Sequence, residues 1–269
     1  MRCDEILKKL EEEYPLECAE DWDNPGLLVG HRNQKIQKIL VALDATEEII
    51  QQAIDSDADM IITHHPLLFH SIRNVNDDSF LGRRLLALIE NGIACYAMHT
   101  NFDVLGMALL NEQQLELKNT HVLDVTDESD GVVEGIGRVG EWEEPRSLMQ
   151  AAEFVRTKLG LDAVRCYGLE QSLRSPEPEK IHRVAVCGGS GKSVIEPAIE
   201  ESAQVLITGD IDYHTAIDAL AQGLYIIDAG HYGTEYGFIA YMANKIRKLF
   251  PDIEIEEARI HQPYQVVAE

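Results

Sequence analysis

The chain has 269 residues, enough to bury a sizeable core in one large or two modest α/β domains. Hydrophobic residues make up 45% of it and charged residues 26%, a balance typical of folded globular proteins and richer in apolar side chains than disordered chains. The 23 lysines and arginines against 47 aspartates and glutamates give a formal net charge of −24, which repels phosphate backbones and anionic membranes and so disfavours nucleic acid and membrane partners.

The N-terminal residues predict an amphipathic helix rather than a targeting segment. Lys8 and Lys9 lead into an acidic stretch, without the continuous apolar core of a signal peptide. Later segments also stay below the roughly 18 uninterrupted apolar residues that a membrane helix needs. The five cysteines form no CxxC pair and are odd in number, which fits a reducing compartment better than a disulfide framework. We therefore expect a cytoplasmic protein.

The following elements form a β-α-β unit. Residues 35–41 predict a strand, residues 47–58 a helix and residues 60–63 an apolar strand. A further helix leads to another apolar strand at residues 93–97. This order of elements is typical of a parallel sheet with crossover helices.

The middle of the chain alternates strand and helix again. Residues 135–141 predict a short strand, Pro145 to Leu159 a helix, and residues 162–168 a returning strand. Gln171 to Glu179 contains two prolines among polar residues and predicts an exposed loop. We expect these elements to supply the middle of a second half.

The second half repeats the first. The same order of strand, helix, strand and strand recurs at residues 180–186, 194–203, 205–208 and 224–227. Lys35 and Lys180 are 145 positions apart, and so are Thr63 and Thr208, so the two copies keep register. The repeat predicts an α/β protein of two related domains, one formed by residues 1–125 and completed by residues 236–269, the other by residues 126–235.

A histidine follows the last strand of each copy. His99 and Asp103 enclose three residues, as do His231 and Glu235, so both copies carry the pattern His-x-x-x-carboxylate. A helix is expected after each carboxylate, at residues 104–117 and 236–250. Both carboxylates therefore lie near strand-to-helix junctions, where α/β proteins commonly place active sites.

Two adjacent histidines, His64 and His65, follow the buried strand of the first copy, and Pro66 ends that strand. Taken alone, such a pair is more often incidental than a metal site. Because the repeat brings equivalent strand ends together across an approximate two-fold, three imidazoles and two carboxylates can converge in one cleft between the halves: His64, His65, Asp103, His231 and Glu235. This set suits a pair of divalent ions, and its lack of cysteine argues against a finger-type zinc site.

The role of His99 stays open at this point. It corresponds to His231 in the repeat, yet it competes with His64 and His65 for the same space. An imidazole there could orient a ligand of the metals or transfer a proton, and a hydrogen-bonded structural histidine is equally compatible with the sequence.

Other motifs carry less weight. Gly188 to Ser193 approaches a nucleotide-binding P-loop, but the spacing requires glycine where Val186 stands, so a strand-to-helix connection is favoured over an anion-binding turn. Gly135 to Gly140 spells GxGxxG without opening a helix, so no dinucleotide cofactor is inferred. The sequence contains neither a Gly-x-Ser-x-Gly elbow nor a recognisable Cys-His catalytic signature. Metal-assisted chemistry remains.

Five segments together identify a family resemblance: residues 20–30, 63–66, 99–103, 208–210 and 230–235. Through them the chain resembles, over nearly its whole length, the NIF3 (NGG1p-interacting factor 3-like) proteins, often named GTP cyclohydrolase 1 type 2 homologs. The resemblance implies a two-domain α/β fold, a toroidal homo-hexamer and a binuclear metal site on the inner side of the ring. The short span from Asp103 to Lys180 leaves no room for the domain that some members insert between the halves.

Two functional hypotheses follow from the resemblance and the ligand set. The first is a metal-dependent hydrolase acting on GTP or a related heterocycle or phosphoester, with ring opening as the reaction that the family's name implies. The second is a non-enzymatic metal-binding or adaptor protein. Histidine and carboxylate ligands accept zinc, manganese, iron, cobalt or nickel, so both hypotheses allow any of these ions, two per subunit.

Overall fold

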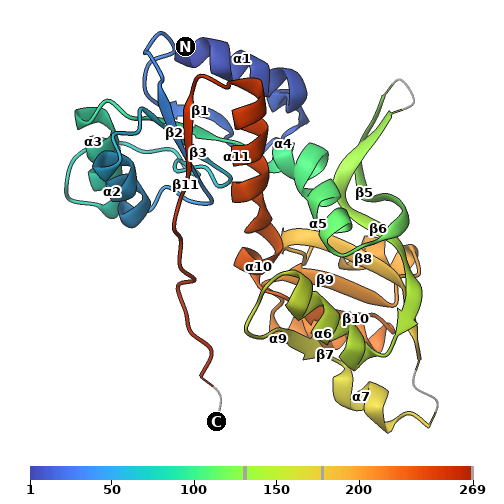
Figure 1. Cartoon of the computed structure of the whole chain (residues 1–269). Helices are drawn as coiled ribbons and strands as arrows, with labels where there is room; N and C mark the ends of the chain where they lie inside the picture. Colours follow the sequence, from blue (N-terminus) through green and yellow to red (C-terminus); the bar gives the residue numbers. More distant parts are fainter. Residues whose placement is uncertain (130–131, 177–178, 268–269) are drawn as a thin grey trace. The chain divides into compact units, whose positions relative to one another are not determined.

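The computed structural model describes residues 1–129, 132–176 and 179–267, which form two compact units with a sheet each (Figure 1). The first unit comprises Met1–Phe102 and Gly237–His261, and the second comprises Asp103–Tyr236 and the C-terminal residues from Gln262. None of the helices in the described ranges is long and apolar enough to cross a membrane.

The sheet of the first unit has a parallel centre. Among the described residues it contains five strands, in this order across the sheet: β1 (Gly26–Val29), β4 (Ala94–Ala97), β3 (Met60–Thr63), β2 (Lys38–Ala42) and β11 (Glu254–Glu257). β2, β3 and β4 run parallel, and β11 joins β2 in the same direction. β1 closes the other edge antiparallel to β4. The carboxyl ends of β3 and β4 therefore meet at the same edge of the sheet.

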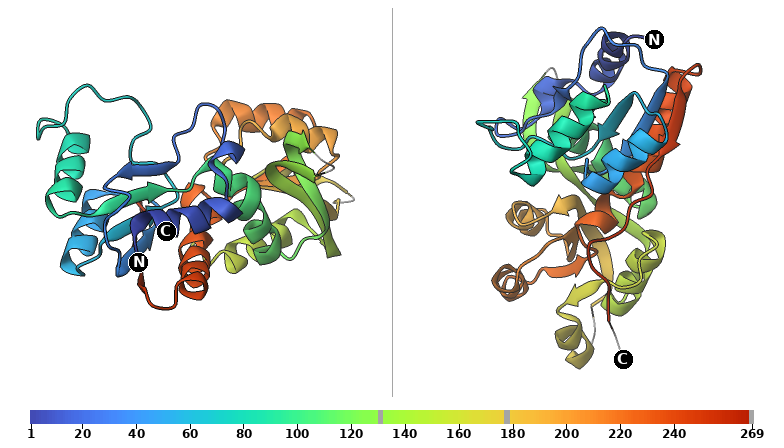
Figure 2. Two further views of the ribbon diagram at one scale, coloured as in Figure 1. Left: turned by 90° about the horizontal axis from the view of Figure 1, so that it is seen from above. Right: turned by 90° about the vertical axis from the view of Figure 1, so that its left-hand side faces the viewer.

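Helices pack around this sheet, and the four longest of them are amphipathic. The helices are α1 (Cys3–Glu13), the 3-10 turn η1 (Leu16–Cys18), α2 (Glu47–Asp55), α3 (Phe80–Glu90), α4 (Thr100–Phe102) and α11 (Gly237–Leu249). Thr46 and Ser79 cap α2 and α3 by accepting hydrogen bonds from backbone N–H groups three residues on. Figure 2 shows α2 and α3 together on one face of the sheet, where their apolar residues share a core with Leu40, Ile61 and Cys95.

The sheet of the second unit repeats this parallel centre. Its described strands are, in order, β5 (Lys118–Ser129), β6 (Val132–Arg146), β8 (Ile181–Ser190), β9 (Val205–Gly209), β10 (Tyr225–Asp228) and β7 (Arg165–Tyr167). β8, β9 and β10 are parallel, and β7 lies antiparallel on β10 as β1 lies on β4. The antiparallel pair β5 and β6 extends the β8 side.

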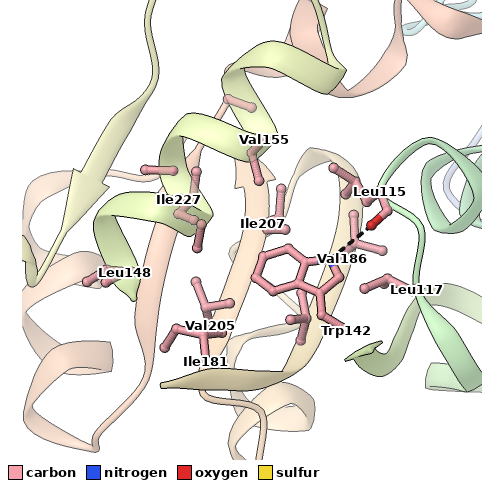
Figure 3. Close-up of a cluster of buried hydrophobic side chains, with 14 of the residues drawn as sticks. Leu115, Leu117, Trp142, Leu148, Val155, Ile181, Val186, Val205, Ile207 and Ile227 are labelled. Atoms are coloured by element: carbon pink, nitrogen blue, oxygen red, sulfur yellow. Dashed lines mark hydrogen bonds between the residues drawn. The ribbon is translucent and has the colours of Figure 1, made fainter. Parts of the chain in front are cut away.

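The helices of the second unit pack against two apolar cores, one of which is drawn in Figure 3. They are the π-helical turn η2 (Asp103–Met107), α5 (Ala108–Gln114), α6 (Leu148–Lys158), α7 (Leu169–Arg174), α8 (Ile195–Glu200), α9 (Tyr213–Ala221) and α10 (His231–Glu235). Trp142 packs among aliphatic side chains such as Val155 and Ile207, and its indole Nε1 donates to the Leu115 carbonyl at 2.9 Å. The only polar atom of this buried ring is thereby satisfied.

The predicted repeat is present in the structure and extends further than the sequence pattern indicates. α1 and α6 are also 145 positions apart, from Cys3 and Leu148 at their starts to Glu13 and Lys158 at their ends. The two units thus share a helix, three parallel strands and an antiparallel edge strand, which agrees with the predicted fold of two related α/β domains.

Three predicted elements of the middle region need correction. Strand 135–141 is only part of β6, and its partner β5 is missing from the prediction. Pro145 lies in β6 and does not start a helix. α6 begins after Ser147, which forms a reciprocal capping box with Gln150. Gln171 to Glu179 is not a loop throughout, because α7 extends to Arg174, while residues 177–178 of that prediction lie outside the described part of the chain.

The structure divides the chain at different residues from the sequence pattern, which places the boundaries at 125/126 and 235/236. The second unit begins at Asp103, because η2, α5 and β5 pack against β6 and β8. The predicted helix at residues 104–117 is also divided into the π-helical turn η2 and the shorter α5.

Candidate metal centre

His64 and His65 stand directly after β3, as the sequence predicts. His65 continues the backbone pairing by donating its N–H to the Leu43 carbonyl at 2.9 Å. The imidazole of His64 is fully buried, and its Nδ1 lies 2.8 Å from the Met98 carbonyl oxygen. A carbonyl only accepts hydrogen bonds, so Nδ1 carries the proton and Nε2 carries the lone pair of His64.

Carboxylates orient two further histidines of the first unit, His65 and His99. Nδ1 of His65 is 3.0 Å from Oδ1 of Asp44, and Nδ1 of His99 is 2.8 Å from Oδ1 of Asp23. An ionised carboxylate accepts a hydrogen bond from the Nδ1–H group, so the lone pair of the neutral imidazole lies on Nε2. Carboxylate–histidine pairs of this kind typically support metal-binding imidazoles.

The Asp23 carboxylate is ionised at neutral pH. Burial alone would raise its pKa, but hydrogen bonds from His99 and from the hydroxyl and backbone N–H of Thr100 outweigh burial and hold the pKa at about 2. Asp23 therefore remains an acceptor for the Nδ1 proton of His99.

Three histidines of the first unit, His64, His65 and His99, lie close together. The ring centroid of His64 is 4.9 Å from that of His65 and 5.3 Å from that of His99, and His65 and His99 are 5.6 Å apart. Each ring offers a nitrogen that lies within 4.8 Å of those of the other two, so the group could hold a metal ion. His99, whose role the sequence leaves open, belongs to this group by position.

In the second unit, His231 and Glu235 lie at the two ends of the short helix α10. Nδ1 of His231 is 2.9 Å from Oδ2 of Asp210, another carboxylate–histidine pair that orients the ring. Nε2 of the same ring is 3.3 Å from Oε1 of Glu235, whose side chain is buried. The spacing of four residues thus places a predicted imidazole ligand and a predicted carboxylate ligand on one face of α10.

Asp103, the first residue of η2, lies in the same unit near the same carboxylate. Burial raises the pKa of the Cys187 thiol, and the negative charges of Asp103 and Glu235 raise it further. Both carboxylates therefore act on one buried thiol. A bound dication would offset their combined negative charge, which fits the ligand chemistry predicted from the sequence.

Gly189 makes room for the Glu235 carboxylate. A Cβ atom at this position would lie 2.5 Å from Oε1 of Glu235 and 3.3 Å from Nε2 of His231. The backbone of Gly189 has φ +63°, and its N–H donates to the Thr234 hydroxyl at 2.9 Å. Glycine at position 189 is thus required twice, by backbone conformation and by the space of the acidic side chain.

We expect Gly189→Ala to lower metal content and to destabilise the fold by about 1–2 kcal/mol, the cost of left-handed backbone. Gly160→Ala is the matched control, because Gly160 has φ +64° and open space around its Cβ position. Both variants should lose similar stability in denaturant titrations, and only Gly189→Ala should lose metal in elemental analysis. Equal metal content in the two variants would show that the space at Gly189 is unimportant.

The segment from Gly188 to Ser193, predicted as a strand-to-helix connection, belongs partly to a strand. Gly188, Gly189 and Ser190 still belong to β8, whose register shifts between Val186 and Ser190, so the turn toward α8 starts only at Gly191. The Lys192 side chain is 68% exposed and its Nζ lies 3.1 Å from Oδ2 of Asp212. A P-loop lysine would instead face bound phosphates.

We predict that Lys192→Ala leaves metal content and GTP binding within about twofold of wild type, because exposed ion pairs contribute little. Equilibrium dialysis with GTP, alongside elemental analysis, tests this. A loss of GTP binding at normal metal content would identify the turn as a phosphate clamp.

Comparison with known proteins agrees with this architecture. A model of the Duf34/NIF3 (NGG1p interacting factor 3) family matches residues 1–263. The chain belongs to this family. The resemblance inferred from the sequence motifs is therefore confirmed.

Relatives match this NIF3 protein over nearly its whole length. A protein of Clostridium perfringens named GTP cyclohydrolase 1 type 2 homolog is 33% identical, covering 99% of this chain and all of the relative. A protein of Lactococcus lactis with the same name is 35% identical over 96% of each chain. The crystal structure of a Bacillus cereus protein related to NIF3 has a TM-score of 0.88 and 25% identity, covering 99% of both chains. The predicted NIF3 fold is confirmed.

Three aspartates that orient histidines in this NIF3 protein were not among the residues predicted from its sequence. Asp44 follows β2 and orients the histidine after β3, and Asp210 follows β9 and orients the histidine after β10. Asp23 precedes β1 and orients the histidine after β4, which pairs with β1. In each case the aspartate flanks the neighbouring strand of the sheet. The sequence signal that could have revealed them is an aspartate next to the end of one strand, where the neighbouring strand of the sheet is followed by a histidine.

Proposed function

We propose that this NIF3 protein is a metal-dependent hydrolase that binds two divalent ions through five side chains: His64, His65, Asp103, His231 and Glu235. The observation that carries the proposal is the common orientation of the histidines. In His64, His65 and His231, a carbonyl or carboxylate oxygen lies within hydrogen-bond distance of Nδ1, so Nε2 is the nitrogen that each ring would offer to an ion. The buried carboxylate of Glu235 adds a charged oxygen ligand beside His231.

When bound, the ions would supply Lewis acidity to an electrophile and acidify a water molecule. The chain's own residues would orient the histidines and transfer protons. His99 can accept a proton at Nε2, because Asp23 holds its Nδ1 proton and stabilises the charged imidazolium. Thr100 keeps Asp23 in place through two hydrogen bonds.

The substrate class comes from the names of the relatives. GTP cyclohydrolase 1 type 2 homolog, the name of the proteins from Clostridium perfringens and Lactococcus lactis, supports hydrolysis of GTP or a related heterocycle or phosphoester. The test is a metal-stripped sample reloaded with zinc, manganese, iron, cobalt or nickel and incubated with nucleotides and phosphoesters. Substrate loss that follows metal content supports the hydrolase. Inactivity of every loaded form would leave the second candidate.

That second candidate is a metal-binding adaptor without catalysis. The family description, NGG1p interacting factor 3, denotes a protein interaction and not a reaction, and this favours the candidate. An adaptor would bind metal and a protein partner. It would consume none of the tested substrates, whatever its metal content.

We also propose that this NIF3 protein forms a homo-hexamer in the cytoplasm. The proposal rests on the family resemblance, and the scattered odd cysteines support a reducing compartment. Light scattering at micromolar concentration should give about six times the chain mass of 30.2 kDa. A stable particle with the mass of one chain would contradict the hexamer.

A further inference from the structure

Two large aromatic side chains, Trp22 and Phe69, lie exposed beside the histidines of the first unit. Trp22 is 57% exposed and Phe69 46%, and their ring centroids are 5.7 Å apart. Single exposed apolar residues are ordinary, but two large rings in contact form a patch that is typical of a binding surface. We call these two residues the aromatic pair.

The aromatic pair adjoins the histidine group. The Trp22 ring centroid is 5.9 Å from that of His99, with the planes at 78°, and the Phe69 centroid is 6.1 Å from it, with the planes at 71°. Both rings therefore meet His99 edge to face. A molecule lying on the aromatic pair would therefore lie beside His99.

The segment around Trp22 holds the aromatic pair in place. Asn24 donates its side-chain N–H to the Leu68 carbonyl at 2.6 Å and so anchors the chain next to Phe69. Asp23, between Trp22 and Asn24, binds His99. Three consecutive residues thus present one ring, orient a histidine and anchor the second ring.

Phe69 belongs to a long segment without regular structure. Residues 64–79 contain neither helix nor strand. Loops of this length inside compact domains usually carry function, often as part of a binding site. The anchoring by Asn24 gives this loop a fixed contact at the point where it presents an aromatic ring.

We infer that the aromatic pair is a stacking surface for a planar heteroaromatic ring, such as the base of a nucleoside. This inference rests on the proposed function and names the part of the substrate that the first unit recognises. Indole and phenyl faces stack on any such ring, and the adjacent imidazoles place the ring beside the proposed metal ligands. The contact with the histidine group favours a small ring over a second copy of the chain as the occupant.

Guanosine is the probe, and ribose, which lacks a ring system to stack, is the matched control. The chain has two tryptophans, and Trp142 is 1% exposed, so quenching by the probe reports on Trp22. Guanosine should quench wild-type fluorescence and ribose should not. By calorimetry, Trp22→Ala should raise the guanosine Kd about 5- to 100-fold, and Trp22→Phe should retain most of the affinity. Tyr213→Ala, at a tyrosine that is 71% exposed in the second unit, should have no effect.

Metal content and light scattering on the same samples separate the possible outcomes. Normal metal content with weakened guanosine binding in Trp22→Ala supports the inference, even if no hydrolysis is ever found. Metal-dependent hydrolysis with unchanged guanosine binding in Trp22→Ala overturns the inference and leaves the proposed function standing. Absence of quenching by guanosine in wild type also overturns the inference. If the particle mass of Trp22→Ala changes as well, the aromatic pair is a contact between copies of the chain.

Discussion

Glu235→Gln should lower bound metal from about two ions per chain to one or none. The amide keeps the size of the side chain but removes the negative charge that would offset two dications. Nε2 of His231 lies 3.3 Å from Oε1 of Glu235, so the substitution also replaces an acidic oxygen beside the imidazole ligand. Mass spectrometry under non-denaturing conditions measures the occupancy.

The fold should survive this change. Each unit has its own sheet and core, so circular dichroism of Glu235→Gln should stay near that of wild type. Glu143→Gln is the control, because Glu143 is an exposed residue of β6 and should leave both ions bound. Full occupancy in Glu235→Gln would remove Glu235 from the proposed binuclear site.

The central parallel strands, β2 to β4 and β8 to β10, were predictable because their sequences are largely apolar. All four residues of β3 are buried, and the apolar run at residues 60–63 matches its bounds. β11, which is parallel to β2, was not predicted, because its sequence Glu-Ile-Glu-Glu has no apolar run. β5 was not predictable in the same way, because the residues toward its C-terminal end, 125–128, are exposed and contain no apolar run. Two signals competed for the start of α6: Pro145, and a capping box of Ser147 with Gln150. The helix begins after Ser147, where the side chains of the capping box form hydrogen bonds with the backbone.

The candidate ligands were predictable from strand ends, whereas their hydrogen-bond partners were not. His64 and His65 follow a buried strand in the sequence itself. The pairing of Asp23 with His99 depends on β1 lying antiparallel beside β4, and strand order is a property of the folded sheet. The π-helical turn at Asp103 likewise reflects packing of η2 against β6, which no local pattern indicates.

Asp23→Asn should reverse the tautomer of His99. One carboxylate oxygen, Oδ2, accepts from both the N–H and the hydroxyl of Thr100, at 3.0 and 2.6 Å. In the variant we expect the amide oxygen to take this place, because there it keeps both Thr100 donors; the NH₂ group then stands at the Oδ1 position and gives up the hydrogen bond from the Asn24 N–H, which donates to Oδ1 at 2.7 Å. The NH₂ group then faces Nδ1 of His99 and donates to it, which moves the imidazole proton to Nε2. NMR of ¹⁵N-labelled histidine in the metal-free protein detects this exchange directly.

With a proton on Nε2, His99 can neither offer that nitrogen to an ion nor accept a proton there. We expect a fall of about 10- to 100-fold in metal affinity or in metal-dependent turnover. A chelator competition measures the first and rate measurements at saturating metal measure the second. Asp59→Asn is the matched control, because one oxygen of Asp59 likewise accepts two hydrogen bonds, here from the backbone N–H groups of Gln37 and Lys38, without orienting a histidine in the described structure. If His99 kept its proton on Nδ1 in Asp23→Asn, or if both affinity and turnover matched wild type, Asp23 would have no positioning role in the centre.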